Sequence, residues 1–186
     1  MSSTEILSQN PKILIKKSFL TTQDCQIILS DIKDLARSKV MIGDKSAVNN
    51  ERTSRSKVMN NNKIIESAIN KISEEFHLDK ENCEPVIFTN YKIGQEYKKH
   101  FDVLSDAKNG QRIISCILYL NSCKGGETFF DDLKLTIKPV AGNLILFENC
   151  FKNTTHLNPL TLHSSLPVIK GEKNILTFWF RNKAFH

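Results

Sequence analysis

The chain has 186 residues, of which 40% are hydrophobic and 25% charged, as in an ordinary globular domain that can bury a sizeable core. No apolar run approaches the length of a membrane span, so we expect no membrane contact. The formal net charge of +6 raises the question of nucleic acid, but the lysines are spread along the chain without interleaved aromatic residues, which disfavours it. A basic groove for an acidic or extended peptide is also compatible with this charge.

Two features bear on the cellular setting. The segment Met1 to Pro11 is polar and lacks the apolar stretch of a secretory signal. The cysteines are scattered, odd in number and form no C-x2-C pair, which argues against a zinc ribbon and for reduced thiols. We therefore expect a cytoplasmic protein, whose oligomeric state the sequence leaves open. The five cysteines are Cys25, Cys83, Cys116, Cys123 and Cys150.

The first half of the chain predicts helices and a long loop. Apolar residues recur there with a period near 3.6, which is typical of amphipathic helices, and a polar stretch rich in asparagine separates the two periodic segments. In chain order we expect a strand at 11–20, a helix at 22–37 that begins after a capping box at Thr21, a loop at 39–62 with short strands around Val40 and Val58, and a helix at 62–76 followed by His77 at the surface or the helix C-terminus.

From Glu84 onward the pattern changes to short apolar or alternating segments divided by turns, which is typical of strands. Two helices followed by many short strands predict a β-sandwich or barrel backed by the N-terminal helices. The expected strands are 85–91, 112–120, 128–130 after a turn at Gly125-Gly126, 133–137, 142–147 and 173–182.

The last strand has two different faces. Side chains alternate along a strand, so Asn174, Leu176, Phe178 and Phe180 share one face that is mostly apolar and suits a core. The other face carries an ammonium, a hydroxyl, an indole and a guanidinium, which is typical of a strand that lines a polar ligand cavity. Its residues are Lys173, Ile175, Thr177, Trp179 and Arg181.

Three side chains from distant parts of the sequence form a candidate metal site. His100 and Asp102 are two residues apart, so both side chains lie on one face of an extended segment, and His163 would join them from a later strand. Two imidazoles and one carboxylate can hold one face of a ferrous ion and leave the opposite face open, as in non-haem iron oxygenases. A lone His or Asp is more often simply solvated, so the prediction depends on the motifs that surround these three residues.

The motifs around these residues are Y-x5-Y-x2-H-x-D from Tyr91, Q-R-x6-Y-L-N from Gln111, G-G-E-T-x-F from Gly125, P-x2-G-x4-F from Pro139, and H-x3-P-V-x2-G-x-K-x5-W from His163. In this order, between about Arg52 and Arg181, the chain resembles the catalytic domain of the prolyl 4-hydroxylases. Those enzymes are iron(II)- and 2-oxoglutarate-dependent dioxygenases whose core is a double-stranded β-helix, or jelly roll. Here Arg181 stands where algal relatives tend to have His.

The resemblance implies a mostly β fold with a jelly-roll core and N-terminal helices packed on one sheet. Residues 1–83 would supply a strand, the helices and a substrate loop that are integral to a single domain, and residues 84–186 the catalytic core. The loops Ser38–Asn62 and Ser105–Gly110 are candidate lids over the peptide.

The resemblance also implies roles for individual residues. His100, Asp102 and His163 match the catalytic iron ligands, and Lys173 matches the base that pairs with the distal carboxylate of 2-oxoglutarate. Arg112 and Tyr119 are seven residues apart, so they share a strand face only if a bulge intervenes or Arg112 precedes the strand. Tyr91, Tyr119 and Thr128 match positions that hydrogen-bond the cosubstrate, and Arg52, Ser54, Tyr97, Arg112 and Trp179 match positions that surround the peptide in plant and algal enzymes.

The activity implied is hydroxylation of prolyl residues, at the 4-position, in peptides or proteins, with succinate and CO2 as the other products. Fe(II), 2-oxoglutarate, O2 and ascorbate are the expected cofactors and cosubstrates. Two alternatives of the same chemistry are a hydroxylase of a free amino acid and an AlkB-like demethylase of nucleic acid. A binding module that keeps the fold without catalysis is a third, which the intact ligand set and Lys173 disfavour.

Overall fold

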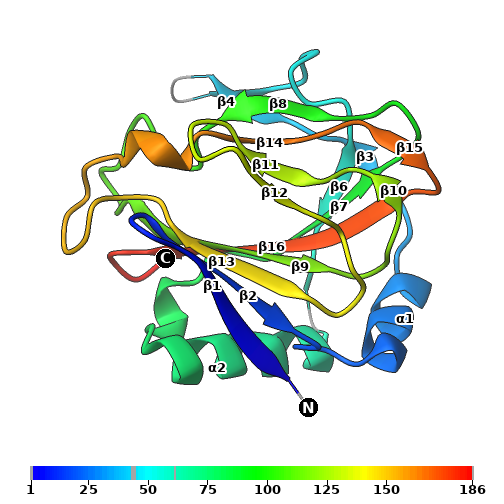
Figure 1. Cartoon of the computed structure of the whole chain (residues 1–186), viewed down its shortest axis with the longest axis horizontal. Coiled ribbons are helices and arrows are strands. Elements are labelled where there is room, and N and C mark those ends of the chain that lie inside the picture. The colour runs from blue at the N-terminus through cyan, green and yellow to red at the C-terminus, as the bar shows by residue number, and fades with distance from the viewer. Residues whose placement is uncertain (1, 43–44, 61, 186) are drawn as a thin grey trace.

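Two antiparallel sheets face each other, and two helices cover the outer face of the larger sheet (Figure 1). The computed structural model describes residues 2–42, 45–60 and 62–185, so residues 43, 44 and 61 of the predicted loop lie outside the described residues. Strands dominate the regular structure, and the mostly β, jelly-roll fold expected from the sequence is confirmed.

The larger sheet has eight strands, with β9 and β16 paired along most of their lengths near its middle. At one edge β1 pairs with β2 and is largely exposed, so its side chains show no apolar alternation and the sequence predicts no strand before Pro11. In spatial order the strands are β1 (Ser3–Gln9), β2 (Lys12–Lys17), β13 (Leu144–Glu148), β9 (Arg112–Tyr119), β16 (Lys173–Arg181), β7 (Ile87–Tyr91), β6 (Arg55–Val58) and β3 (Ala36–Arg37).

The smaller sheet has four strands, and its register brings distant parts of the sequence together. Strand β14 pairs with β8 so that His163 lies opposite His100. Two short two-stranded pairs, β10 with β15 from distant segments and β4 with the adjacent β5, complete the strands. The bounds are β12 (Leu135–Ile137), β11 (Thr128–Phe130), β14 (His163–Ser165) and β8 (Tyr97–His100) in spatial order, then β10 (Lys124–Gly125), β15 (Val168–Lys170), β4 (Val40–Ile42) and β5 (Lys45–Ala47).

Helix α1 (Thr22–Ser30) begins where the sequence predicts but ends earlier. Thr21 and Asp24 form the predicted capping box. The predicted extension of this helix to residue 37 is wrong, because Ala36–Arg37 instead pair with β6 as an edge strand. Tertiary pairing therefore overrides the helical spacing of the apolar residues that follow Ser30.

Helix α2 (Lys63–Phe76) matches its predicted range closely. The Asn62 side chain accepts hydrogen bonds from the backbone N–H groups of Ile64 and Ile65, which caps the first turn. His77 adopts a left-handed conformation at the end of the helix, so its predicted place at the C-terminus is confirmed. Among the described residues, no helix is long and apolar enough to cross a membrane. Two single-turn helices are η1 (Lys80–Asn82) and η2 (Pro159–Thr161).

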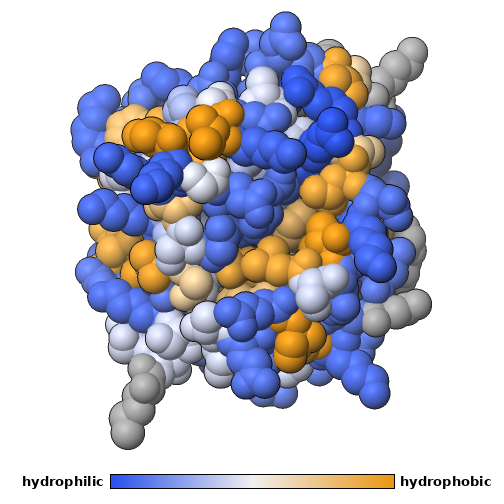
Figure 2. Space-filling model, turned by 90° about the vertical axis from the view of Figure 1, so that its right-hand side faces the viewer, coloured by the Kyte–Doolittle hydropathy of each residue, from blue (hydrophilic) through white to orange (hydrophobic). Residues whose placement is uncertain are grey.

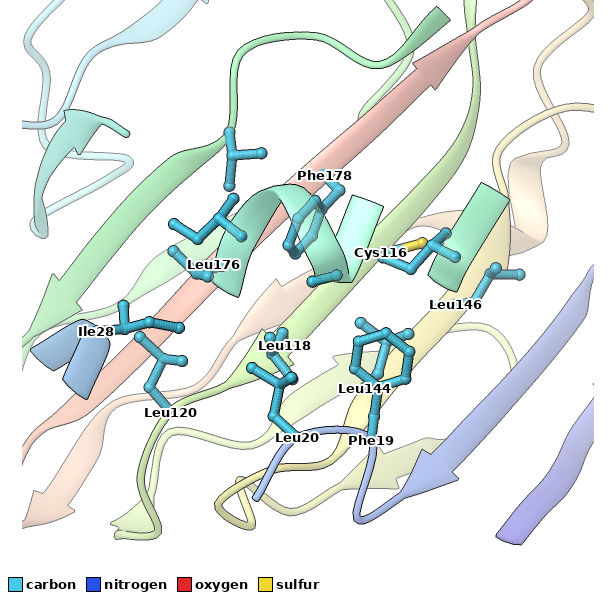
Figure 3. Close-up of a cluster of buried hydrophobic side chains, with 14 of the residues drawn as sticks. Phe19, Leu20, Ile28, Cys116, Leu118, Leu120, Leu144, Leu146, Leu176 and Phe178 are labelled. Carbon is cyan, nitrogen blue, oxygen red and sulfur yellow. The ribbon is translucent and has the colours of Figure 1, made fainter. Parts of the chain in front are cut away.

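Separate apolar cores lie on the two faces of the larger sheet. On the outer face, side chains from β9, β13 and β16 gather with Ile28 of α1 (Figure 3). On the inner face, Phe130, Phe147 and Ile175 are among the residues that fill the space between the sheets. Each fully buried side chain of this size contributes about 1.5–3 kcal/mol, so both cores stabilise the sheet.

Strand β16 has the two faces that its sequence predicts. Leu176, Phe178 and Phe180 belong to the core under the helices. Lys173, Ile175, Thr177 and Trp179 instead line a cavity between the sheets. The alternation of side chains along this strand therefore separates the structural face from the cavity face.

A bulge in β9 explains how Arg112 and Tyr119, seven residues apart, can lie on the same face of the sheet. Opposite β16, Phe180 pairs with Ile114 but the next residue, Arg181, pairs with Arg112, so one residue of β9 is skipped. The extra residue returns Arg112 to the inner face that Tyr119 occupies, which is one of the two possibilities that the sequence left open.

The face that carries α1, β10 and β15, at the right-hand side of Figure 1, is mainly hydrophilic, with apolar groups gathered in a band and smaller patches (Figure 2). Two of the exposed large hydrophobic side chains, Ile27 and Ile169, belong to α1 and β15. Isolated exposed side chains of this kind are normal on a globular protein.

Candidate metal centre and adjoining cavities

Three potential ligands converge between the two sheets. His100 ends β8, Asp102 follows two residues later, and His163 begins β14. Their ligand atoms all lie within 4.8 Å of one another. His100 Nε2 is 3.6 Å from Asp102 Oδ1, and His163 Nε2 is 4.0 Å from Asp102 Oδ2. Two atoms 3.6 or 4.0 Å apart can each lie about 2.1 Å from one ion, and a pair as wide as 4.8 Å would need to close slightly around it.

The hydrogen bonds of both imidazoles leave their Nε2 atoms available to a metal. His100 Nδ1 lies 2.8 Å from the Lys98 carbonyl oxygen, and His163 Nδ1 lies 3.0 Å from the Thr161 carbonyl oxygen. A carbonyl oxygen can only accept, so each Nδ1 carries the proton and each Nε2 keeps its lone pair. The residues therefore fit an iron ion by donor type, by geometry and by tautomer.

The protonation states also suit a metal. Burial lowers the pKa of His100 to about 3, with a further contribution from His163, so the ring is neutral at physiological pH. Burial by itself would raise the pKa of Asp102, but the two imidazoles and a hydrogen bond from Ser115 lower it to about 2. Neutral imidazoles and an ionised carboxylate are the forms that bind metal.

A hydrogen-bonded pair behind Asp102 fixes its carboxylate. The Ser115 hydroxyl donates to Asp102 Oδ2 at 2.6 Å and accepts from Asn149 Nδ2 at 2.9 Å. Ser115 and Asn149 are fully buried. Because outer partners of this kind orient metal ligands, both residues join the candidate site.

A cavity beside the three ligands contains Lys173 in its wall, and we call it the inner cavity. The Lys173 side chain is only 1% exposed, and its Nζ donates to Ser165 Oγ at 2.8 Å. Burial lowers the pKa of Lys173 to about 7. Within the described part of the chain Lys173 forms no ion pair, so an anionic ligand would stabilise its protonated form.

The other residues predicted to bind the cosubstrate lie in or directly behind this wall. Tyr91 and Thr128 line the inner cavity. Tyr119 is not part of the lining, but its hydroxyl is 2.7 Å from Thr128 Oγ1, and burial raises its pKa so that the phenol stays protonated. Gly126 permits the close packing, because a Cβ there would lie 3.1 Å from Lys173 Cδ and its φ of +69° is unfavourable for other residues.

A second hollow of about 650 Å³, which we call the outer groove, adjoins the metal centre. Strands β3 and β6 contribute to its lining, together with the segment 101–105 and Arg112. The outer groove and the inner cavity share part of their lining and therefore meet at the metal centre. The shared residues are Arg52, Tyr97, His100, Asp102 and Trp179.

Arg52 and Tyr97 form a layer over His100. The buried Arg52 guanidinium donates to Ser54 Oγ at 3.1 Å and to Thr89 Oγ1 at 2.9 Å, and it lies 4.9 Å from the centre of the Tyr97 ring. The Tyr97 ring stacks on His100 at 3.5 Å, and burial raises the pKa of Tyr97 to about 12. Thus Arg52 and Tyr97 border the outer groove, while Ser54 is not part of its lining and accepts a hydrogen bond from Arg52.

Trp179 and Arg112 are held by a buried ion-pair group. Arg112 donates two hydrogen bonds of 2.7 Å to Glu84, and Arg181 donates a third to the same carboxylate. The Arg112 guanidinium also lies 3.7 Å from the centre of the Trp179 ring. Arg112 therefore borders the groove, but its charge is already compensated. The Trp179 Nε1 atom is buried and has no hydrogen-bond partner among the described residues.

Sequence reasoning did not find four residues of this region. Ser165 and Ser115 were detectable in principle, because each shares a strand face with a predicted residue, His163 and Tyr119 respectively. Glu84 and Asn149 follow no motif and reach the site through contacts with distant residues. Only the folded chain identifies that second pair.

Comparison with known proteins agrees with this geometry. A profile of the 2OG-Fe(II) oxygenase superfamily matches residues 86–181. Prolyl 4-hydroxylase 2 of Arabidopsis thaliana is 34% identical over an alignment of 215 residues, gaps included. The alignment covers 99% of this chain and 72% of the relative. A putative prolyl 4-hydroxylase of Acanthamoeba polyphaga mimivirus is 29% identical, with 94% of this chain and 76% of the relative covered.

A solved structure is similar over nearly the whole chain. The 2OG complex of a viral collagen prolyl hydroxylase from Paramecium Bursaria Chlorella virus-1 matches with a TM-score of 0.74 and 31% identity. The match covers 91% of this chain and 95% of the viral protein. The chain therefore belongs to the 2OG-Fe(II) oxygenase superfamily and, within it, to the prolyl 4-hydroxylase family of enzymes.

Proposed function

We propose that this protein is an iron(II)- and 2-oxoglutarate-dependent dioxygenase that hydroxylates prolyl residues, at the 4-position, in peptides or proteins. His100, Asp102 and His163 hold the iron, and Lys173 anchors the distal carboxylate of 2-oxoglutarate. One observation carries the assignment: a single cavity joins the three metal-binding side chains to a buried ammonium that has no ion pair in the described part of the chain. Membership of the family supports it.

When bound, iron and 2-oxoglutarate use O2 to insert an oxygen atom into a C–H bond, and the cosubstrate leaves as succinate and CO2. The protein's own groups prepare this chemistry. The carbonyl oxygens of Lys98 and Thr161 hold the two imidazoles in the ligating tautomer, and Ser115 orients the Asp102 carboxylate. Lys173 is buried, and a hydrogen bond to Ser165 holds its ammonium in place. Its attraction for a carboxylate is therefore stronger than that of a solvated lysine.

The outer groove supports a peptide substrate. Tyr97 and Trp179 offer aromatic surface beside the metal centre, which suits the apolar ring of proline. The Arg52 guanidinium lines the groove and is a donor that a peptide carbonyl could accept from. A proline-containing segment in polyproline II form would lose little conformational entropy on entering the groove.

Several finer points belong to the same proposal. Ascorbate would keep the iron reduced, and a reducing, cytoplasmic setting is supported by five cysteines that are all free. Residues 1–83 would be an integral part of one domain with the core at 84–186. The packing of α1 and α2 on strands of the later half supports this, as does the pairing of β2 with β13.

The test is a mass-spectrometric screen of proline-containing peptides with Fe(II), 2-oxoglutarate and ascorbate. The expected result is the gain of one oxygen atom on proline, in step with succinate, and fragmentation with authentic standards identifies 4-hydroxyproline. Free proline and methylated single-stranded nucleic acid are run in parallel. Oxygenation of free proline alone, or demethylation of the nucleic acid without any peptide product, would replace the prolyl assignment with that alternative.

A further inference from the structure

The charged residues that line the outer groove are nearly all cationic. Its lining includes the cationic residues Arg37, Lys39, Arg52 and Lys57 and a fifth, Arg112, whose charge Glu84 already compensates. The lining contains a single carboxylate, Asp102, which faces the metal centre. The groove therefore presents an excess of positive charge to whatever enters it.

None of these four cations has an acidic partner among the residues that the structure describes. Arg52 donates to two hydroxyl groups, Arg37 to the carbonyl oxygens of Thr53 and Asn49, and Lys57 to that of Lys33. Lys39 is exposed on the groove wall. Hydrogen bonds to neutral groups leave the charge uncompensated, so an anionic ligand would gain from all four.

The general excess of lysine in the chain does not by itself account for this asymmetry, because two other hollows carry cations together with carboxylates. The hollow beside α2 at the N-terminal strands is lined by Lys16 and Lys71 together with Glu74 and Glu75. Another, between α2 and the segment 83–86, is lined by Lys80 together with Glu66 and Glu84. Concentration of unpaired cations is a property of the groove that adjoins the metal centre.

We propose that the outer groove selects peptides that carry acidic side chains close to the target proline. Lys39 and Lys57 are among the residues that bind these acidic side chains. This inference rests on the proposed prolyl hydroxylation and names the class of substrate. The lining also includes the apolar residues Phe101, Val103 and Leu104, so the occupant combines carboxylates with apolar groups. A peptide of alternating acidic and apolar residues has that character, whereas a polynucleotide carries phosphate along its whole length.

The dimensions of the groove limit where the acidic residues lie. The four cations form what we call the cationic wall, which includes Arg37 of β3 and Lys57 of β6; strand β6 has four residues and therefore spans about 13 Å. A peptide in polyproline II form advances about 3.1 Å per residue, so we expect the carboxylates within about four residues of the proline. Because β6 and β3 lie at one edge of the larger sheet, we expect them on one side of the proline.

The experiment compares three peptides of equal length, each with one proline and with two flanking glutamates, glutamines or lysines. Each peptide is made in two versions, in which the two variable residues lie either before or after the proline. An exposed ion pair contributes a factor of about 1.4 to 5, so two pairs predict a preference for glutamate over glutamine of about 2- to 25-fold in kcat/KM. The preference should appear in one version only and should shrink as salt is added.

Charge reversal gives the decisive comparison. In the double variant Lys39→Glu/Lys57→Glu, the preference for the glutamate peptide should disappear, because the two new carboxylates offset the charges of Arg37 and Arg52. Lys71→Glu alters the net charge at a distant hollow, and it should keep the wild-type order. The ratio between peptides is insensitive to loss of folded enzyme, because such loss lowers all rates together.

The outcomes distinguish failure of the proposed acidic selectivity from failure of the proposed prolyl hydroxylation. Equal kcat/KM for all three peptides, or a glutamate preference that survives the double charge reversal, would overturn the acidic selectivity and leave prolyl hydroxylation standing. Hydroxylation of none of the peptides, with 2-oxoglutarate consumed on another substrate, would overturn both. Tight, salt-sensitive binding of single-stranded RNA that blocks turnover of every peptide equally would assign the cationic wall to nucleic acid instead.

Discussion

Replacing Lys173 with methionine should weaken the binding of 2-oxoglutarate and leave metal binding nearly unchanged. Lys173 is 1% exposed, and its ammonium donates to the Ser165 hydroxyl without an ion pair in the part of the chain that the structure describes, so the bound carboxylate would face an uncharged side chain in the variant. Loss of one member of a desolvated charge pair costs about 2–5 kcal/mol, which is about 30-fold to several thousand-fold in the dissociation constant. Methionine keeps most of the side-chain volume, so little of this effect comes from a cavity.

The same ammonium predicts a pH dependence whose sign is defined. Burial lowers the pKa of Lys173 from 10.5 to about 7, so the protein without cosubstrate loses this proton as the pH rises above about 7. A carboxylate prefers the protonated form, and the dissociation constant of 2-oxoglutarate should therefore rise about tenfold per pH unit above 7. Between about pH 7 and 10.5 the unfolded chain binds more protons at this position, so the Lys173 contribution to unfolding free energy increases with pH there.

The assay is isothermal titration calorimetry of 2-oxoglutarate into the Mn(II)-loaded protein, without O2, from pH 6 to pH 9. Lys170→Met serves as the matched control, because Lys170 is exposed on the neighbouring strand β15. The control should keep the affinity and the pH slope, and Lys173→Met should lose both. An unchanged dissociation constant in Lys173→Met would refute the assignment of the inner cavity to the cosubstrate.

The remaining predictions concern the metal centre and the groove. His163→Ala should abolish iron-dependent succinate formation, because two ligands do not hold the ion in place, and near-normal activity at saturating iron would contradict the ligand assignment. Ser115→Ala should weaken iron affinity about 10- to 100-fold, measured by metal titration, because Asp102 Oδ2 loses the hydrogen bond that orients it, and an unchanged affinity would show that Ser115 only fills space. Trp179→Ala should lower kcat/KM for a peptide more than uncoupled consumption of 2-oxoglutarate, because the indole lines the groove, and equal losses of both would place its effect on the metal centre instead.

Local patterns in the sequence are sufficient for the elements whose two faces differ. The alternation of residues along β16 by itself separates Leu176 and Phe178 from Lys173 and Trp179, and the fold confirms the division. Caps act over three residues, and so the start of α1 at Thr21 is also predictable. For Arg112 and Tyr119 to share a face, their spacing requires either a bulge or a strand that begins after Arg112, and the β9 register contains the bulge.

Local patterns fail where pairing with a distant strand decides the structure. The helical spacing after Ser30 is real, but Ala36–Arg37 gain strand hydrogen bonds from β6, and the helix ends early. Strand β1 is an exposed edge, so burial imposes no alternation that could reveal it. Both errors arise because backbone hydrogen bonding in a strand depends on its pairing partner, which cannot be predicted from the residues of the segment itself.

The order of motifs along the chain indicates His100, Asp102, His163 and Lys173, and through them an enzyme of the 2-oxoglutarate-dependent class. The tertiary structure brings these side chains into one cavity and adds residues that no motif contains. The hydrogen bonds from Asn149 through Ser115 to Asp102 and the sharing of Glu84 by two arginines exist only between distant segments. The uncompensated charge of the outer groove is likewise a property of packing, because a lysine in the sequence shows its charge but not whether a carboxylate lies beside it.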